Sequence, residues 1–212
     1  MITNIKTLSL IMLILTVFSC QNAEQKSIQF IEKEYGIFEN ENNSIGVELK
    51  LNEFDNWKDL LERTERIACS DSLPKLILKS ATNIKTVYFR NPCWENYGCI
   101  LIKHKNTIQI HNDTISKSDR FHYPLDSLAT VLKKDFENNG KIPSWSASPE
   151  KLMIFISYDN GQMENFPKTL RSVVHEYEKL TDNVVLKIWL NEKLNIPPPP
   201  PPPPANWKEE TE

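Results

Sequence analysis

Three histidines in the middle of the chain are its first candidates for chemistry. His104, His111 and His122 lie close together in sequence. On two paired strands His104 and His111 could approach one another, and neutral imidazole is a common metal ligand. No acidic residue stands at a convincing ligand spacing beside them, so we interpret them as surface histidines near turns.

Two catalytic motifs are present only in part. His175-Glu176 begins like the zinc-binding helix motif H-E-x-x-H, but Lys179 stands where the second histidine is required. Ser148 and Lys151 match the S-x-x-K of penicillin-recognising enzymes, but Ser148 stands before a predicted strand and not at a helix start, and the partner motifs of that family are missing. The five glycines form no phosphate-binding loop motif. We therefore predict no catalytic residue, no cofactor and no metal ligand.

The four cysteines are the candidates for covalent chemistry. Cys93 and Cys99 enclose five residues between two strand-like runs. A disulfide between these two would close a hairpin loop, and this is the pairing we predict. A bond from Cys69 to one of them, free thiols and a bound metal are the alternatives. Disulfides in small domains are typical of oxidising compartments.

Cys20 follows a short apolar segment. Leu8–Phe18 carries no charge and comes after Lys6, which is the pattern of a secretory signal. The run has about 11 residues, whereas a membrane-spanning helix needs roughly 20. Val-Phe-Ser-Cys at positions 17–20 resembles the lipobox of bacterial lipoproteins, although its phenylalanine is bulkier than the usual residue.

The lipobox resemblance implies a location and a membrane contact. Residues 1–19 would be a removable signal peptide, and Cys20 would carry the diacylglyceryl lipid that holds the protein on a membrane of the cell envelope. An ordinary secretory signal or an uncleaved anchor is the alternative. Gln21 replaces the aspartate of the enteric inner-membrane retention signal, which slightly favours the outer membrane. A formal net charge of −3 gives no electrostatic footprint for nucleic acid.

The remaining chain predicts one α+β domain, a small mixed sheet with packed helices. Polar residues 20–44 predict a tether, 45–195 the domain, and 196–212 a polyproline tail. Periodicity predicts a helix that Asn52 or Asp55 caps and that ends near Ala68. Alternating or β-branched runs predict strands over 45–51, 75–79, 85–90, 99–104 and 107–111.

Residues 107–190 predict a β-α-β-α-β unit. A strand at 107 is followed by a helix from Leu125 to the stop at Gly140, a strand over 151–158, a helix after Pro167 and a strand over 184–190. This order, with Asp159 after the apolar strand, resembles the periplasmic domain of the ExbD/TolR family. The resemblance implies a fold and a binding role in an envelope complex.

Two departures from that family limit what the resemblance implies. The apolar N-terminal run lacks the membrane aspartate of proton-driven transduction. Residues 141–149 also look like an inserted loop. Proton-coupled activity is therefore not implied for this chain.

These observations predict a membrane-anchored envelope lipoprotein that binds or scaffolds another envelope protein without catalysis. Trp94, Tyr97 and Trp145 fall in predicted loops, where exposed aromatic residues can anchor a partner or a glycan. The alternative is that these aromatic side chains fold back on the core. One alternative is an accessory component of a TonB/ExbD-type transport system. Another is an envelope hydrolase, whose site would have to bring together distant residues, namely His104, His111, Asp113 and Glu176.

Eight consecutive prolines, Pro197–Pro204, distinguish the C-terminal segment. Because proline fixes φ and lacks a backbone donor, the run predicts an extended left-handed helix of roughly 25 Å at about 3.1 Å per residue. It could present Trp207 and the acidic end KEETE as a recognition tip. It could equally be a tail without consequence.

Overall fold

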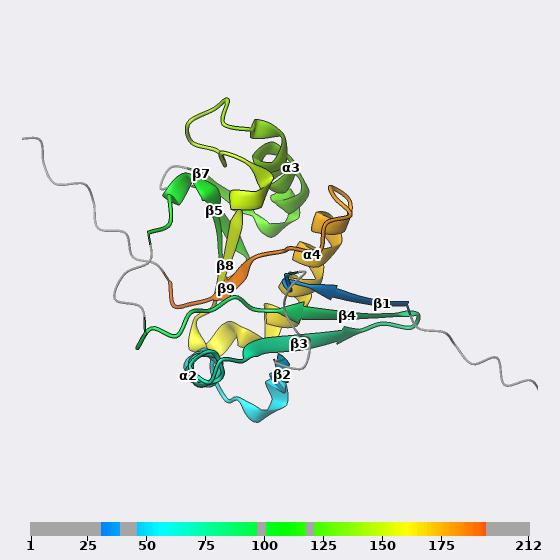
Figure 1. Ribbon diagram of the computed structural model, residues 1–212, viewed down its shortest axis with the longest axis vertical. Coiled ribbons are helices and arrows are strands. Elements are labelled where there is room, and N and C mark those ends of the chain that lie inside the picture. The colour runs from blue at the N-terminus through cyan, green and yellow to red at the C-terminus, as the bar shows by residue number, and fades with distance from the viewer. Residues whose placement is uncertain (1–30, 39–45, 97–100, 118–120, 194–212) are drawn as a thin grey trace, which may run out of the picture. The chain divides into compact units, whose positions relative to one another are not determined.

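A computed structural model describes residues 31–38, 46–96, 101–117 and 121–193. The predictions on the signal peptide, Cys20, Tyr97, Cys99 and the polyproline tail lie outside these residues. The fold is α+β, as the sequence predicted, with two sheets and three α-helices in the described residues (Figure 1).

The first sheet has four strands in the order β1-β4-β3-β2. Their bounds are β1 Ile31–Tyr35, β2 Gly46–Glu48, β3 Leu73–Lys79 and β4 Asn83–Tyr88. β2 and β3 are parallel, and helix α2, Trp57–Ala68, connects them and lies against β3 (Figure 1). The predicted caps of this helix are wrong, because the side chain of Asn56 accepts the hydrogen bond from Asp59 N at 3.1 Å.

The second sheet has five strands in the order β7-β6-β5-β8-β9. Their bounds are β5 Thr107–His111, β6 Thr114–Lys117, β7 Phe121–Pro124, β8 Met153–Ser157 and β9 Ile188–Leu190. β5, β8 and β9 run parallel, whereas β6 and β7 continue antiparallel from β5. Helices α3, Leu128–Asn138, and α4, Phe166–Glu178, form the connections to β8 and β9 and contact each other.

Short 3₁₀ helices complete the described structure. They are η2 Leu51–Glu53, η3 His104–Asn106, η4 Leu125–Ser127, η5 Pro149–Lys151 and η6 Asn160–Asn165. Buried residues of both sheets form one hydrophobic cluster, in which Val87 and Phe89 of the first sheet region share a core with Ile154 and Phe166. A shared core of this kind makes the stability of one sheet depend on the other.

The strand predictions differ from the structure at several places, and the strands predicted over 45–51 and 184–190 are shorter, Gly46–Glu48 and Ile188–Leu190. β1 lies in the segment predicted as a tether. It was not predicted as a strand because its sequence, IEKEY, lacks an apolar alternation, and three of its five residues are exposed. Residues 101–103 are not in a strand. β6 and β7 were not predicted; β6 follows a tight turn in which Asn112 and Asp113 have φ of 45° and 61°.

The disulfide prediction is also corrected. Cys93 is bonded to Cys69, with a Cα–Cα distance of 4.6 Å, so the predicted Cys93–Cys99 pairing is wrong and the alternative from Cys69 is confirmed. Cys69 is the C-cap of α2, and residues 70–72 separate it from β3. The antiparallel register pairs the start of β3 with the end of β4, Lys75 with Tyr88, and so brings the residues after β4 back to the end of α2.

Candidate binding site

The three predicted histidines are not brought together. His104 lies in η3 before β5, whereas His111 ends β5, so the two are at opposite ends of one strand. His122 lies on β7, with Nδ1 2.9 Å from Ser116 Oγ. The metal pair considered from the sequence is therefore not formed, and the predicted surface position holds only for His122, since His104 and His111 are half-buried.

A polar cluster links the carboxyl ends of β5 and β8. His111 Nδ1 is 3.0 Å from Ser157 Oγ, and His111 Nε2 is 3.7 Å from Asp159 Oδ1. The side chain of Asn112 closes the cluster, because it donates to Asp159 Oδ2 at 2.6 Å and accepts from Asp159 N at 2.9 Å. Burial lowers the pKa of His111.

This cluster contains serine, histidine and aspartate, but its geometry is not that of a hydrolytic triad. Ser157 is 6% exposed and belongs to β8, so its hydroxyl is not offered to a substrate. The contact of 3.7 Å from His111 to Asp159 is longer than a hydrogen bond. The cluster therefore ties two neighbouring strand ends together.

A second polar cluster follows the same strand ends. The hydroxyl groups of Tyr158 and Thr169 both donate to Asp113 Oδ1, at 2.6 and 2.5 Å. Burial and this hydrogen bond raise the pKa of Tyr158. Sequence reasoning missed both clusters, although residues directly after neighbouring parallel strands are a recognised position for polar groups.

Asp113 also lines a groove between the start of α3 and α4. The groove has a volume of about 480 Å³ and holds three carboxylates and one lysine, Asp113, Asp126, Glu176 and Lys168. Of the four residues considered for a hydrolase, only Asp113 and Glu176 meet here. His104 is at the far end of β5, and His111 is engaged with Ser157. The hydrolase site is therefore not assembled.

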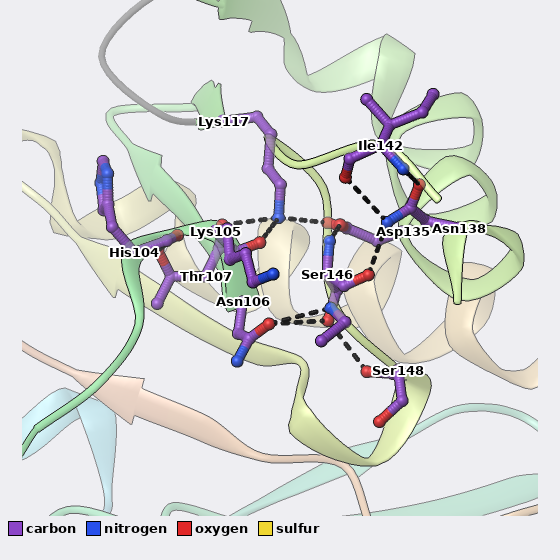
Figure 2. Close-up of polar contacts among 11 residues, drawn as sticks. His104, Lys105, Asn106, Thr107, Lys117, Asp135, Asn138, Ile142, Ser146 and Ser148 are labelled. Carbon is purple, nitrogen blue, oxygen red and sulfur yellow. Dashed lines mark hydrogen bonds and ion pairs between the residues drawn. The ribbon is translucent and has the colours of Figure 1, made fainter. Parts of the chain in front are cut away.

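A buried ion pair lies at the other end of this sheet (Figure 2). Lys117 on β6 and Asp135 on α3 are both fully buried, with Nζ 2.7 Å from Oδ2. Lys117 Nζ also donates to the carbonyl oxygens of Lys105 at 2.7 Å and Thr107 at 3.1 Å. Its ammonium is 5.7 Å from the centre of the Trp145 ring. Burial lowers the pKa of Lys117 and raises the pKa of Asp135, and their mutual attraction opposes both shifts.

The ion pair holds the irregular loop 141–148 in place. Asp135 Oδ1 accepts from Ser146 N at 2.7 Å, and Asn138 Nδ2 donates to Ser146 O at 2.7 Å. Asn106 Oδ1 accepts from Ala147 N at 3.0 Å, and Figure 2 shows these bonds converging on the loop. Trp145 is consequently 7% exposed and packs in the core, so the alternative of an aromatic residue folded back on the core holds for it.

Trp94 is the predicted aromatic residue that the structure does expose. Its side chain is 49% exposed, although it follows the disulfide-bonded Cys93 directly. The Trp94 ring stands at 86° to the ring of Trp189, with 6.0 Å between centroids, and Trp189 contacts Phe155 in the same way at 5.3 Å. The contact with Trp189 therefore holds one side of the Trp94 indole, while the rest of its surface faces solvent.

Trp94 lines a groove of about 460 Å³, which we call the Trp94 groove. Residues of α2, of the segment after β4 and of the end of β9 form its floor, Leu61, Asn91, Pro92, Trp94, Leu190 and Asn191. Charged residues also line it, namely Lys58, Glu62, Glu65, Glu192 and Lys193. The volume lies within the range of about 300–1,000 Å³ that is common for ligand sites.

Hydrogen bonds make the Trp94 groove a preformed feature. The side chain of Asn91 accepts from Leu190 N at 3.0 Å and donates to Leu190 O at 2.5 Å. Trp57 Nε1 donates to the carbonyl of Asn191 at 2.9 Å. The Asn191 side-chain oxygen is buried without a hydrogen-bond partner among the residues that the structure describes.

Cys69, Cys93 and Glu95 place potential ligand atoms within 4.8 Å of one another beside this groove. The two sulfurs are already joined in the disulfide, and metals are bound by thiolates, so this cluster does not hold an ion in the oxidised protein.

Comparisons with family models, with curated proteins and with solved structures found no match for this chain. Among the described residues, no helix combines the length and the apolar character that crossing a membrane requires. The Cys69–Cys93 disulfide fits a compartment outside the cytoplasm.

Proposed function

We propose that the protein is a non-catalytic binding protein of the cell envelope, anchored by a lipid on Cys20. Its ligand is an extended segment of another envelope protein, held in the Trp94 groove. The observation that carries this proposal is the half-exposed indole of Trp94, fixed by Trp189 and by the neighbouring disulfide. Tryptophan residues that are ordered before binding are frequent anchors of protein interfaces.

The groove also suits a peptide chemically. Trp94 and the partly exposed Leu61 and Pro92 offer apolar surface along the groove. The charged lining, with both signs of charge, can position the segment without requiring a strongly charged partner.

A photo-crosslinking amino acid in place of Glu62, an exposed residue that lines the groove, tests the binding role in intact cells. We expect one envelope protein to be captured at this position and not from the exposed Lys133 on α3. Trp94→Ala should reduce the capture at least about tenfold, the effect of losing roughly 1.4 kcal/mol or more at an aromatic anchor.

Phe121→Ala is the matched control, because Phe121 is an aromatic residue, 40% exposed, on β7. Capture that survives Trp94→Ala, or that Phe121→Ala reduces equally, would contradict a binding role for the groove.

Lipid attachment at Cys20 has a direct test. The Val-Phe-Ser-Cys stretch supports it, and the short apolar run before it supports removal of residues 1–19. Cys20→Ser should abolish labelling with palmitate and release the protein from the membrane fraction, with Cys99→Ser as the control. Palmitate labelling that persists in Cys20→Ser would rule out this anchor. Fractionation of the labelled protein also tests the outer-membrane location, which the absence of an aspartate at Gln21 supports.

A second candidate is an accessory role in a TonB/ExbD-type transport system. The succession β5, α3, β8, α4 and β9 between Thr107 and Leu190, with β6 and β7 placed between β5 and α3, supports it, since strand, helix, strand, helix, strand is the order for which the sequence resembles that family. Capture of membrane components of such a system from the Trp94 groove would favour this role. Capture of an unrelated envelope protein would favour the general binding role.

A further inference from the structure

The C-terminal segment leaves the described domain at the Trp94 groove. β9 ends at Leu190, and the next three residues, Asn191, Glu192 and Lys193, all line the groove. Only residues 194–196 separate Lys193 from the first proline. At no more than about 3.6 Å per residue, Pro197 lies within roughly 14 Å of Lys193. The eight prolines therefore begin within reach of Trp94.

The chemistry of the groove suits a proline helix. Successive prolines hold the polyproline II conformation before binding, so little conformational entropy remains to be lost. Grooves that present aromatic side chains recognise such helices by contact with the proline rings. The Trp94 groove offers the exposed indole together with the partly exposed Pro92 and Leu61.

Charge distinguishes the prolines from the rest of the tail. Glu62, Glu65 and Glu192 line the groove against two lysines, so its local charge is slightly negative. The end of the chain, KEETE, carries three glutamates and one lysine. Like charges disfavour the acidic end as the occupant, whereas the uncharged proline run meets no repulsion.

We propose that the Trp94 groove binds the chain's own proline segment, Pro197–Pro204. This inference rests on the proposed function in one respect, since both place a peptide on Trp94. It goes further by naming an occupant within the same chain, with which a partner's segment must compete. An intramolecular segment acts at an effective concentration in the millimolar range, so even weak contacts with the indole suffice for occupancy.

The indole ¹H–¹⁵N resonance of Trp94 tests the proposal. The sample is the mature chain, residues 20–212, carrying Cys20→Ser to keep it in solution, and Trp94→Phe identifies the resonance. Replacing all eight prolines by serine should shift this resonance and leave that of the buried Trp57 in place. A synthetic peptide of residues 194–212, added to the serine variant, should move the Trp94 resonance back in a saturable manner.

Two controls separate the other occupants. Trp207→Phe should leave the Trp94 resonance unchanged; a shift equal to that of the serine variant would assign the groove to the tip instead of the prolines. Dilution should also leave it unchanged; a shift that disappears on dilution would mean that a second copy supplies the segment. No difference between the parent chain and the serine variant would overturn the proposal. The cross-link from position 62 to an envelope protein would survive that failure, so the two proposals can fail separately.

Discussion

Replacing Lys117 by methionine should destabilise the protein by about 3–5 kcal/mol, the cost of leaving one partner of a buried ion pair without the other. Asp135 is fully buried, and its Oδ2 lies 2.7 Å from the Lys117 ammonium. In Lys117→Met the Asp135 carboxylate would either stay charged and buried without its ammonium partner or bind a proton. Both outcomes cost free energy in the folded state. Urea unfolding followed by fluorescence measures the change in the free energy of unfolding.

The double variant Lys117→Met with Asp135→Leu should recover most of the lost stability, because buried ion pairs can often be exchanged for packed apolar residues. Loop 141–148 should nevertheless be less well ordered, since Ser146 N loses the Asp135 Oδ1 acceptor. Faster amide exchange of Ser146 in the double variant would record that loss.

Lys133→Met is the matched control for the single variant. Lys133 lies on the same helix as Asp135 and is 3.7 Å from Glu137, but both side chains of this pair are more than half exposed. Its loss should change the free energy of unfolding by less than about 0.5 kcal/mol. Equal effects of Lys117→Met and Lys133→Met would show that burial does not determine the energy of the Lys117–Asp135 pair.

The sequence predicted those parts of the fold whose periodicity is local. Helices α2 and α4 were predicted because apolar residues recur at helical spacing, and Pro167 marks the first turn of α4. β8 was predicted from a nearly continuous apolar run. β6 was not predicted because one of its buried positions is Lys117. A lysine is expected to be exposed to solvent, and only its ion pair with Asp135 explains why it is buried.

Of the residues that line the Trp94 groove, the sequence singled out only Trp94 as a candidate binding residue. Trp94 was a candidate because it falls in a loop, but Trp145 carried the same signal and is buried. The difference in exposure between these two tryptophans comes from tertiary contacts. Trp145 belongs to loop 141–148, which Asp135 holds through Ser146 N, whereas Trp94 contacts Trp189 almost a hundred residues further along the chain. Neither contact can be inferred from the local sequence.

Removal of the Cys69–Cys93 disulfide should cost about 3 kcal/mol. The bond closes a segment with a sequence separation of 24 residues, and the chain-entropy model gives roughly 3.5 kcal/mol for a loop of that size. Cys69→Ser and Cys93→Ser should therefore each lower the free energy of unfolding by a similar amount. Capture of a partner from position 62 should fall as well, because the disulfide fixes the backbone beside Trp94.

Cys99→Ser distinguishes the Cys69–Cys93 bond from the Cys93–Cys99 bond that the sequence predicted. Because Cys93 is bonded to Cys69, Cys99→Ser should leave the stability unchanged, and its mass spectrum after proteolysis should still contain the linked peptides of Cys69 and Cys93. If the bond were instead between Cys93 and Cys99, Cys99→Ser would destabilise the protein and Cys69→Ser would be harmless. A Cys93–Cys99 bond would close only a short hairpin, and no covalent bond would then join the end of α2 to the segment after β4. The groove requires these two segments to be held together, so the stability of Cys99→Ser also tests how the binding surface is built.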